Sequence, residues 1–160
     1  MKKITYLIIS IIFLNFINAC AGYKPIYTTN LKFEIADYSI KSNAKLGKQI
    51  YYKLYNLSKY NKNKPEAKSV TIIIDTTKSK NATVKDSAGK VLEYRIILTS
   101  NIIIKDYLTD DKLLNKTFSY SSSYKTQDQH TETIKLENKS IEDLVNKIYQ
   151  NLIIEMKQII

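Results

Sequence analysis

The chain has 160 residues, of which 44% are hydrophobic and 25% are charged; this balance allows one packed domain and excludes wholesale disorder. A single Cys, a single His (His130) and three Gly exclude a disulfide framework, a Cys-rich or multi-His metal site and a glycine-rich phosphate loop. The net charge of +10 comes from 24 Lys and one Arg. The planar guanidinium group of Arg is the side chain best suited to recognise nucleic acid, so a chain with one Arg is expected to have no nucleic-acid partner. A surface of anionic lipid explains the positive charge equally well.

The first 19 residues have the three-part pattern of a secretory signal peptide. Lys2 and Lys3 form a positive segment, and an apolar run with three polar interruptions follows from Ile4 to Ile17. This run is too short for a comfortable membrane-spanning helix. An uncleaved N-terminal anchor helix is the alternative interpretation.

The apolar run ends in Ile17-Asn18-Ala19-Cys20, which resembles the lipobox of bacterial lipoproteins. An isolated Cys is otherwise most often a buried small hydrophobe. The resemblance implies that Cys20 receives an S-diacylglyceryl group and, after cleavage before it, an N-linked acyl chain such as palmitate. Ala21 in place of Asp implies sorting to the outer membrane, with the domain on the periplasmic side. Loss of Lys2 and Lys3 lowers the net charge from +10 to +8.

Residues 20–30 are predicted to form a lipidated tether, and residues 31–160 a single domain. The domain begins with a strand over residues 31–40, in which apolar and polar residues alternate. Ser42 or Asn43 then caps a helix that ends near Tyr60. Its apolar stripe has spacings of four, four and three and consists of Leu46, Ile50, Leu54 and Leu57, widened by Tyr51 and Tyr55.

Three strands are predicted in the middle of the chain. The first covers residues 70–75, where β-branched residues predominate, and a polar segment with a turn at 86–89 follows. The second covers residues 91–105, with one apolar face and one mostly polar face. A turn at 109–112 leads to the third strand, whose apolar positions share one parity: Leu114, Phe118, Tyr120 and Tyr124.

The C-terminal segment is predicted to be helical, because its apolar residues recur with a period near 3.6 from Ile141 to Ile159. Ser140 and Asp143 resemble a capping box, and an earlier helical turn through Ile134 and Leu136 is the alternative start. The element order β-α-β-β-β-α predicts an α+β fold: a two-layer sandwich with a four-stranded, mostly antiparallel sheet and two helices on one face.

No set of residues in the sequence makes a convincing active site. Asp110 and Asp111 lie in a predicted turn, where a solvated pair is the simplest interpretation. His130 lies in a polar stretch, and the serines at 119 and 121–123 have no nearby base. We therefore expect no enzymatic activity, no catalytic residues, no metal and no cofactor.

Two surfaces remain as candidates for function. Four lysines lie in and around one predicted hairpin, where they either contact phosphorylated lipid or are simply solvated: Lys78, Lys80, Lys85 and Lys90. The polar face of the central strands is the second surface, and it faces either a partner or water. It is formed by Arg95, Thr99, Asn101, Thr117 and Ser119.

Across residues 20–160 the chain resembles LptE, the lipopolysaccharide-assembly lipoprotein family of Gram-negative bacteria. The segment Gly22-Tyr23-Lys24-Pro25-Ile26-Tyr27 is similar to the family's opening after the lipidated Cys, with Ala21 as an extra residue. The segment at 43–49 resembles the start of the family's first helix, and the segment at 93–101 resembles its central strand. The element order and the long final helix agree as well.

The resemblance implies a function in lipopolysaccharide transport. Proteins of this family plug the outer-membrane β-barrel LptD, help it to assemble and bind lipopolysaccharide on its way to the outer leaflet. Lys85 is the nearest match to one of the family's lipid-binding cations, with Lys90 as the alternative, and Lys125 is a counterpart for a second cation. Two other functions stay open: a lipid-anchored periplasmic binding or inhibitor protein without a barrel partner, and a lipid-anchored hydrolase.

Overall fold

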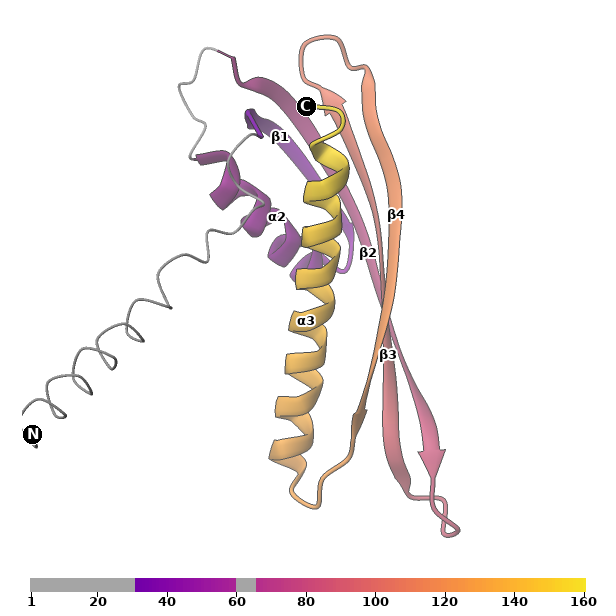
Figure 1. Cartoon of the computed structure of the whole chain (residues 1–160). Helices are drawn as coiled ribbons and strands as arrows, with labels where there is room; N and C mark the ends of the chain where they lie inside the picture. Colours follow the sequence, from indigo (N-terminus) through magenta and orange to yellow (C-terminus); the bar gives the residue numbers. More distant parts are fainter. Residues whose placement is uncertain (1–30, 60–65) are drawn as a thin grey trace, which may run out of the picture.

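The structure is a computed structural model that describes residues 31–59 and 66–160. The predicted signal peptide, the predicted lipidation site Cys20 and the predicted tether lie outside the described residues. The elements follow the predicted order β-α-β-β-β-α, and two helices cover one face of a four-stranded sheet, which confirms the predicted α+β sandwich (Figure 1). Their bounds are β1 Phe33–Ser42, α2 Ala44–Lys59, β2 Lys68–Lys85, β3 Val91–Asp106, β4 Lys112–Lys125 and α3 His130–Met156.

The sheet is mixed rather than wholly antiparallel. Strand order follows chain order, β1-β2-β3-β4, and the two hairpins β2–β3 and β3–β4 are antiparallel as predicted. The pairing of β1 with β2 is parallel, with Phe33 opposite Lys68 and Ile40 opposite Ile74. Helix α2 carries the chain back between these two strands, and such a crossover places both strands in the same direction.

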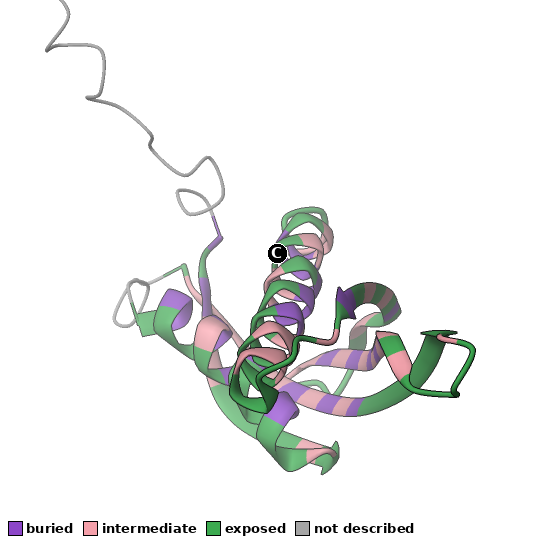
Figure 2. Ribbon diagram, turned by 90° about the horizontal axis from the view of Figure 1, so that it is seen from below, coloured by how far each residue is buried: buried purple, intermediate pink, exposed green. Residues whose placement is uncertain are grey.

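The core lies between the sheet and the two helices. Inward positions in the first half of β2 and the second half of β3 are mostly aliphatic and fully buried, so Ile72, Ile74, Ile102 and Ile104 form the centre of this layer. The predicted stripe of α2 packs onto them, and α3 adds a second stripe. Figure 2 shows the buried residues between the two layers. Burial of this apolar surface is the main contribution to the stability of the domain.

Asn43 rather than Ser42 caps helix α2. The Asn43 side-chain oxygen accepts a hydrogen bond from the Leu46 backbone N–H at 3.2 Å, as expected for an N-cap. Ser42 takes a positive φ of 55° directly before this cap, where the chain turns from β1 into the helix. The predicted stripe is buried, but the assignment of Tyr55 to it is wrong, because this ring is exposed while Tyr51 is buried.

Helix α3 begins ten residues before the predicted capping box. Its first residue is His130, which is exposed, and Ser140 is a buried residue within the helix. The prediction that Ser140 starts the helix is therefore wrong, and the earlier start through Ile134 and Leu136 is confirmed. The added turns have few apolar residues, and polar contacts of Glu137 with β2 and β4 hold them against the sheet.

Strand β2 continues far beyond the predicted residues 70–75. Its second half, residues 77–85, is exposed and polar, yet it pairs with β3 along its length, for example Thr77 with Thr99. This half of the β2–β3 hairpin extends beyond α2 and ends in a projecting tip (Figures 1 and 2). Pairing with β3 rather than burial therefore determines the length of this strand.

Candidate functional site

The projecting tip of the hairpin presents two of the three lysines predicted to bind lipopolysaccharide. Lys85 is the last residue of β2, and Lys90 directly precedes β3. The Asp86 carboxylate accepts hydrogen bonds from the backbone N–H groups of Ala88 and Lys90 at 2.9 and 2.8 Å. Gly89 has a φ of +84°, which glycine adopts without strain. The turn therefore holds the backbone of both lysines in a defined conformation.

Lys125 joins these two residues at the same end of the sheet. It is the last residue of β4 and pairs with Glu93 in β3, two residues beyond the pair of Lys85 with Val91. All three lysines are exposed, and among the described residues no carboxylate lies within ion-pair distance of them. The fold thus gathers three unpaired cations, which we call the tip lysines: Lys85, Lys90 and Lys125. Their role in binding stays a prediction.

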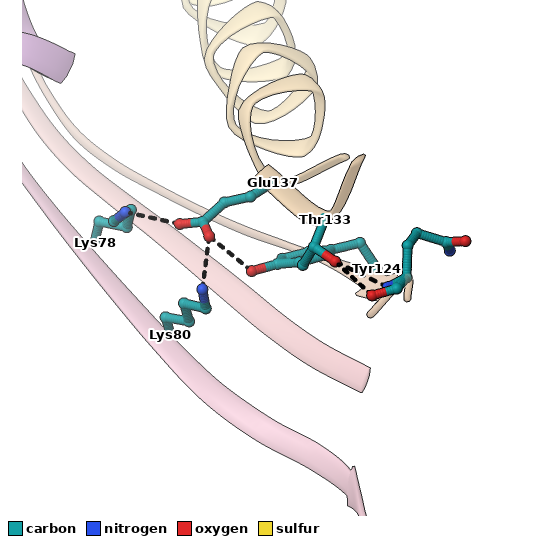
Figure 3. A network of polar contacts seen from close by, with 6 residues as sticks. Lys78, Lys80, Tyr124, Thr133 and Glu137 are labelled. Atoms are coloured by element: carbon teal, nitrogen blue, oxygen red, sulfur yellow. Dashed lines mark hydrogen bonds and ion pairs between the residues drawn. The ribbon is translucent and has the colours of Figure 1, made fainter. Parts of the chain in front are cut away.

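Lys78 and Lys80 have a different environment from the tip lysines. Both project toward Glu137 of α3, whose carboxylate is also a hydrogen-bond acceptor for Tyr124 of β4 (Figure 3). The distances to the carboxylate oxygens are 3.4 Å from the Lys78 ammonium, 2.6 Å from the Lys80 ammonium and 2.9 Å from the Tyr124 hydroxyl. These two lysines are therefore occupied within the domain and add little to the charge of the tip.

Aromatic rings and burial strengthen this polar cluster. The Lys80 ammonium lies 4.3 Å from the centre of the Tyr94 ring, which stacks on Tyr124. Burial acts to raise the pKa of Glu137, but hydrogen bonds from Lys80 and Tyr124 outweigh it and lower the pKa below its ordinary value. Burial likewise acts to lower the pKa of Lys80, and its hydrogen bonds to Glu137 and Tyr124 leave it raised. The carboxylate and the ammonium are thus both held in their charged forms at neutral pH.

The cluster attaches the hairpin to the first turns of α3. Thr133 fixes the connection from β4 to α3, because its hydroxyl accepts a hydrogen bond from the Gln127 backbone N–H at 2.8 Å (Figure 3). The sequence analysis missed Glu137, since its partners Lys78 and Lys80 lie 59 and 57 residues away along the chain. The sequence contains one indication of this carboxylate: two closely spaced lysines, Lys78 and Lys80, in a polar strand.

The sheet face opposite the helices is polar, as predicted. Its side chains bond to one another across the strands: Thr99 to Ser119 at 2.9 Å, and Asn101 to Thr117 and Asn115 at 3.0 and 3.2 Å. These positions are hydroxyl and amide groups in a chain that is otherwise rich in lysine. These groups form a hydrogen-bonding surface of neutral side chains, and the exposed Arg95 adds a positive charge to the same face.

A cleft of 640 Å³ lies between α2 and α3. Its lining combines apolar residues such as Leu46 and Ile141 with three lysines and two glutamates. These charges show that the cleft is not built for a wholly apolar ligand. In the part of the chain that the structure describes, no group of three or more His, Cys, Asp or Glu residues could hold a metal ion, and no helix is long and apolar enough to cross a membrane.

No protein-family model and no curated protein matches the chain, but its fold is found in solved structures. The uncharacterized lipoprotein B of Nitrosomonas europaea has a TM-score of 0.56 and 15% identity over 77% of this chain and 81% of its own. A Caulobacter crescentus CB15 protein described as a lipoprotein has a TM-score of 0.53 and 12% identity over 76% and 86%. The minor lipoprotein of Acinetobacter baumannii has a TM-score of 0.50 and 19% identity over 81% and 92%. The chain thus has a fold that occurs in bacterial lipoproteins.

Proposed function

We propose that this chain is an outer-membrane lipoprotein that plugs and helps to assemble an LptD-type β-barrel and binds lipopolysaccharide during its transport to the outer leaflet. It acts by docking rather than by catalysis, with acyl chains on Cys20 as its anchor. The observation that carries the proposal is the group of tip lysines, which come from the β2–β3 turn and the end of β4 and have no carboxylate within ion-pair distance among the described residues. The lipoprotein fold and the lipobox-like sequence around Cys20 support it.

The tip lysines fit the chemistry of the proposed ligand. Lipid A carries phosphate groups, and ammonium groups bind phosphates through short charge-assisted hydrogen bonds. A lysine that already pairs with a carboxylate must break that pair before it binds, as Lys78 and Lys80 would have to leave Glu137. Lys85, Lys90 and Lys125 need no such exchange, so they are the better candidates for lipid contact.

The polar face of the sheet fits the proposed position inside a barrel. The interior of an outer-membrane barrel is polar and contains water. Hydroxyl and amide groups such as Thr99, Ser119 and Asn101 can exchange their hydrogen bonds for bonds to such a wall. The acyl anchor would keep the domain close to the barrel and raise its effective concentration there.

The partner is tested by purification of the tagged lipoprotein from detergent-extracted membranes, followed by mass spectrometry of the proteins that accompany it. The proposal predicts one large β-barrel protein in comparable amount. Recovery of the lipoprotein as a monomer would contradict the proposed plug and support the alternative of a periplasmic binding or inhibitor protein without a barrel. The mass of the purified protein also reports whether Cys20 carries acyl chains.

The ligand is tested by charge reversal at the tip. We expect Lys85→Glu with Lys90→Glu to weaken lipopolysaccharide binding at least tenfold, because each reversal replaces attraction to phosphate by repulsion. Lys112→Glu with Lys139→Glu is the matched control, since both lysines are exposed, lie at the start of β4 and within α3 rather than in the tip turn, and change the net charge equally. Equal binding by the two variants at moderate salt would mean that the tip lysines are merely solvated.

A further inference from the structure

Helix α2 presents a regular stripe of cationic and aromatic side chains to solvent. The five residues recur at spacings of three, four, three and four, which places them on one side of a helix. All five are exposed, and Tyr52 is 55% exposed. The stripe lies opposite the buried residues of α2 and consists of Lys45, Lys48, Tyr52, Tyr55 and Lys59. We call it the α2 stripe.

The charge of α2 differs in sign from that of the helix beside it. Helix α2 contains four Lys and no Asp or Glu in its 16 residues. Helix α3 contains five acidic residues and three Lys in its 27 residues. An abundance of Lys across the whole chain would affect both helices alike, so composition alone does not explain a helix without any acid. The outer side of α2 is therefore a concentrated positive surface.

The tyrosines of the stripe belong to a larger aromatic group. Tyr51 lies beneath them, with its ring centre 5.6 Å from Tyr52, 5.7 Å from Tyr55 and 4.0 Å from Tyr38 of β1. The Lys59 ammonium lies 4.7 Å from the Tyr55 ring centre. Three of these rings are exposed large side chains that the domain itself does not cover: Tyr38, Tyr52 and Tyr55.

We propose that the α2 stripe rests on the headgroup layer of an anionic phospholipid membrane. Tyrosine rings are favoured at the membrane–water interface, and clusters of lysine on an amphipathic helix attract anionic lipid. The inference rests on the lipid anchor of the proposed function for proximity, and not on the barrel partner. It assigns separate tasks to the two cationic surfaces, with the tip for the transported lipid and the stripe for the supporting membrane.

The length of chain before the domain makes a membrane the partner of choice over an acidic protein. Only 12 residues separate Cys20 from Phe33, the first residue of β1. Fully extended, such a segment spans about 45 Å. An acylated Cys20 therefore keeps the domain within reach of lipid headgroups at all times, whereas a soluble acidic protein would have to be recruited from solution.

Each lysine near an anionic membrane surface strengthens binding of the domain to that surface roughly fivefold. Lys45→Gln, Lys48→Gln and Lys59→Gln together should therefore lower the ratio of docked to undocked domain on the order of a hundredfold. Tyr52→Ser should lower it further, because the ring no longer enters the interface. All four side chains are exposed, so the fold should survive these changes.

The test uses the mature acylated protein in vesicles, with a fluorescent label at one introduced cysteine. Asn56→Cys lies on the outer side of α2, and Ser121→Cys lies on the opposite face of the sheet as the control. In vesicles with phosphatidylglycerol, quenching by spin-labelled lipid should reach the label at position 56 and not the label at 121. Quenching at 56 should fall in pure phosphatidylcholine and in the triple Gln variant.

The outcomes separate this inference from the proposed function. Removal of the tip charges by Lys85→Gln, Lys90→Gln and Lys125→Gln lowers the net charge by the same amount and should leave quenching at position 56 unchanged. Equal quenching at 56 and 121, or no effect of the triple α2 variant, would overturn the inference. Docking of the stripe without a co-purifying barrel would contradict the proposed plug and leave the stripe supported. The protein mass shows separately whether the anchor is present.

Discussion

Replacement of Glu137 by Gln tests whether the polar cluster holds the hairpin to α3. The substitution keeps the size of the side chain and removes its negative charge. Two good hydrogen bonds reach the carboxylate, from the Lys80 ammonium at 2.6 Å and from the Tyr124 hydroxyl at 2.9 Å, and the 3.4 Å bond from Lys78 is weaker. The side chain of Glu137 is 19% exposed, whereas that of Lys80 is 35% exposed.

These figures fix the expected loss of stability. A hydrogen bond to a charged group contributes about 1.5–3 kcal/mol when it is well buried. Solvent screens the exposed Lys80, and the amide oxygen of Gln still accepts one hydrogen bond, so we expect a total loss of about 1–2 kcal/mol. For a domain of this size the loss corresponds to a decrease in Tm of roughly 3–6 °C.

Urea unfolding followed by circular dichroism measures this loss across a range of pH. The pKa of Glu137 in the folded protein lies below its ordinary value of 4.5, so its contribution is complete above that value and disappears as the pH falls through the folded pKa. The difference between the wild type and Glu137→Gln should therefore be constant near neutral pH and shrink below about pH 4.5.

Glu132→Gln is the control on the same helix. Glu132 pairs with Lys135 at 2.7 Å, but the side chain of Glu132 is 46% exposed, so this substitution should cost less than about 0.5 kcal/mol. Equal losses for the two variants would refute the reasoning, because they would mean that the partly buried cluster contributes no more than a surface ion pair. A loss at position 137 that did not change with pH would refute the assignment to charge.

Two further substitutions test local features of the sheet. The buried hydroxyls of Thr76 and Ser100 form a hydrogen bond at 2.9 Å, so Ser100→Ala should lower the free energy of unfolding by about 1–3 kcal/mol, because the Thr76 hydroxyl loses its partner. Adding Thr76→Val to this variant should recover much of the loss, and a double variant less stable than Ser100→Ala would contradict the account. Gly89→Ala should cost about 1–2 kcal/mol because of the positive φ at the tip, and Gly89→Asn should cost less. Among the described residues no atom lies within 4 Å of the added carbon, so equal urea midpoints for all three proteins would show that the backbone conformation there is unstrained.

Periodic patterns in the sequence predict most of this fold. The aliphatic residues of β2 and β3 and the stripe of α2 lie where their spacing placed them, because burial of one face is a local property of the chain. The turns at 86–89 and 109–112 follow from local chemistry for the same reason.

Long-range contacts explain what the sequence analysis did not predict. Residues 77–85 have no buried face, so only their pairing with β3 makes them a strand. Helix α3 begins at His130, ten residues before the predicted start, because Glu137 and Thr133 bond to residues outside the helix. The direction of β1 relative to β2 depends on how α2 crosses the sheet, which no local pattern contains. The α2 stripe went unnoticed because Tyr55 was assigned to the buried side.

The order of the strands in the sheet repeats their order in the chain, and this has a consequence for the way the protein is made. A polypeptide that is synthesised amino end first can add each strand to the edge of the one before it, without waiting for a distant segment. The last element to emerge is α3, which supplies seven of the buried residues. Until α3 is in place, α2 alone covers the aliphatic layer of the sheet, and a newly made chain would benefit from a chaperone during that interval.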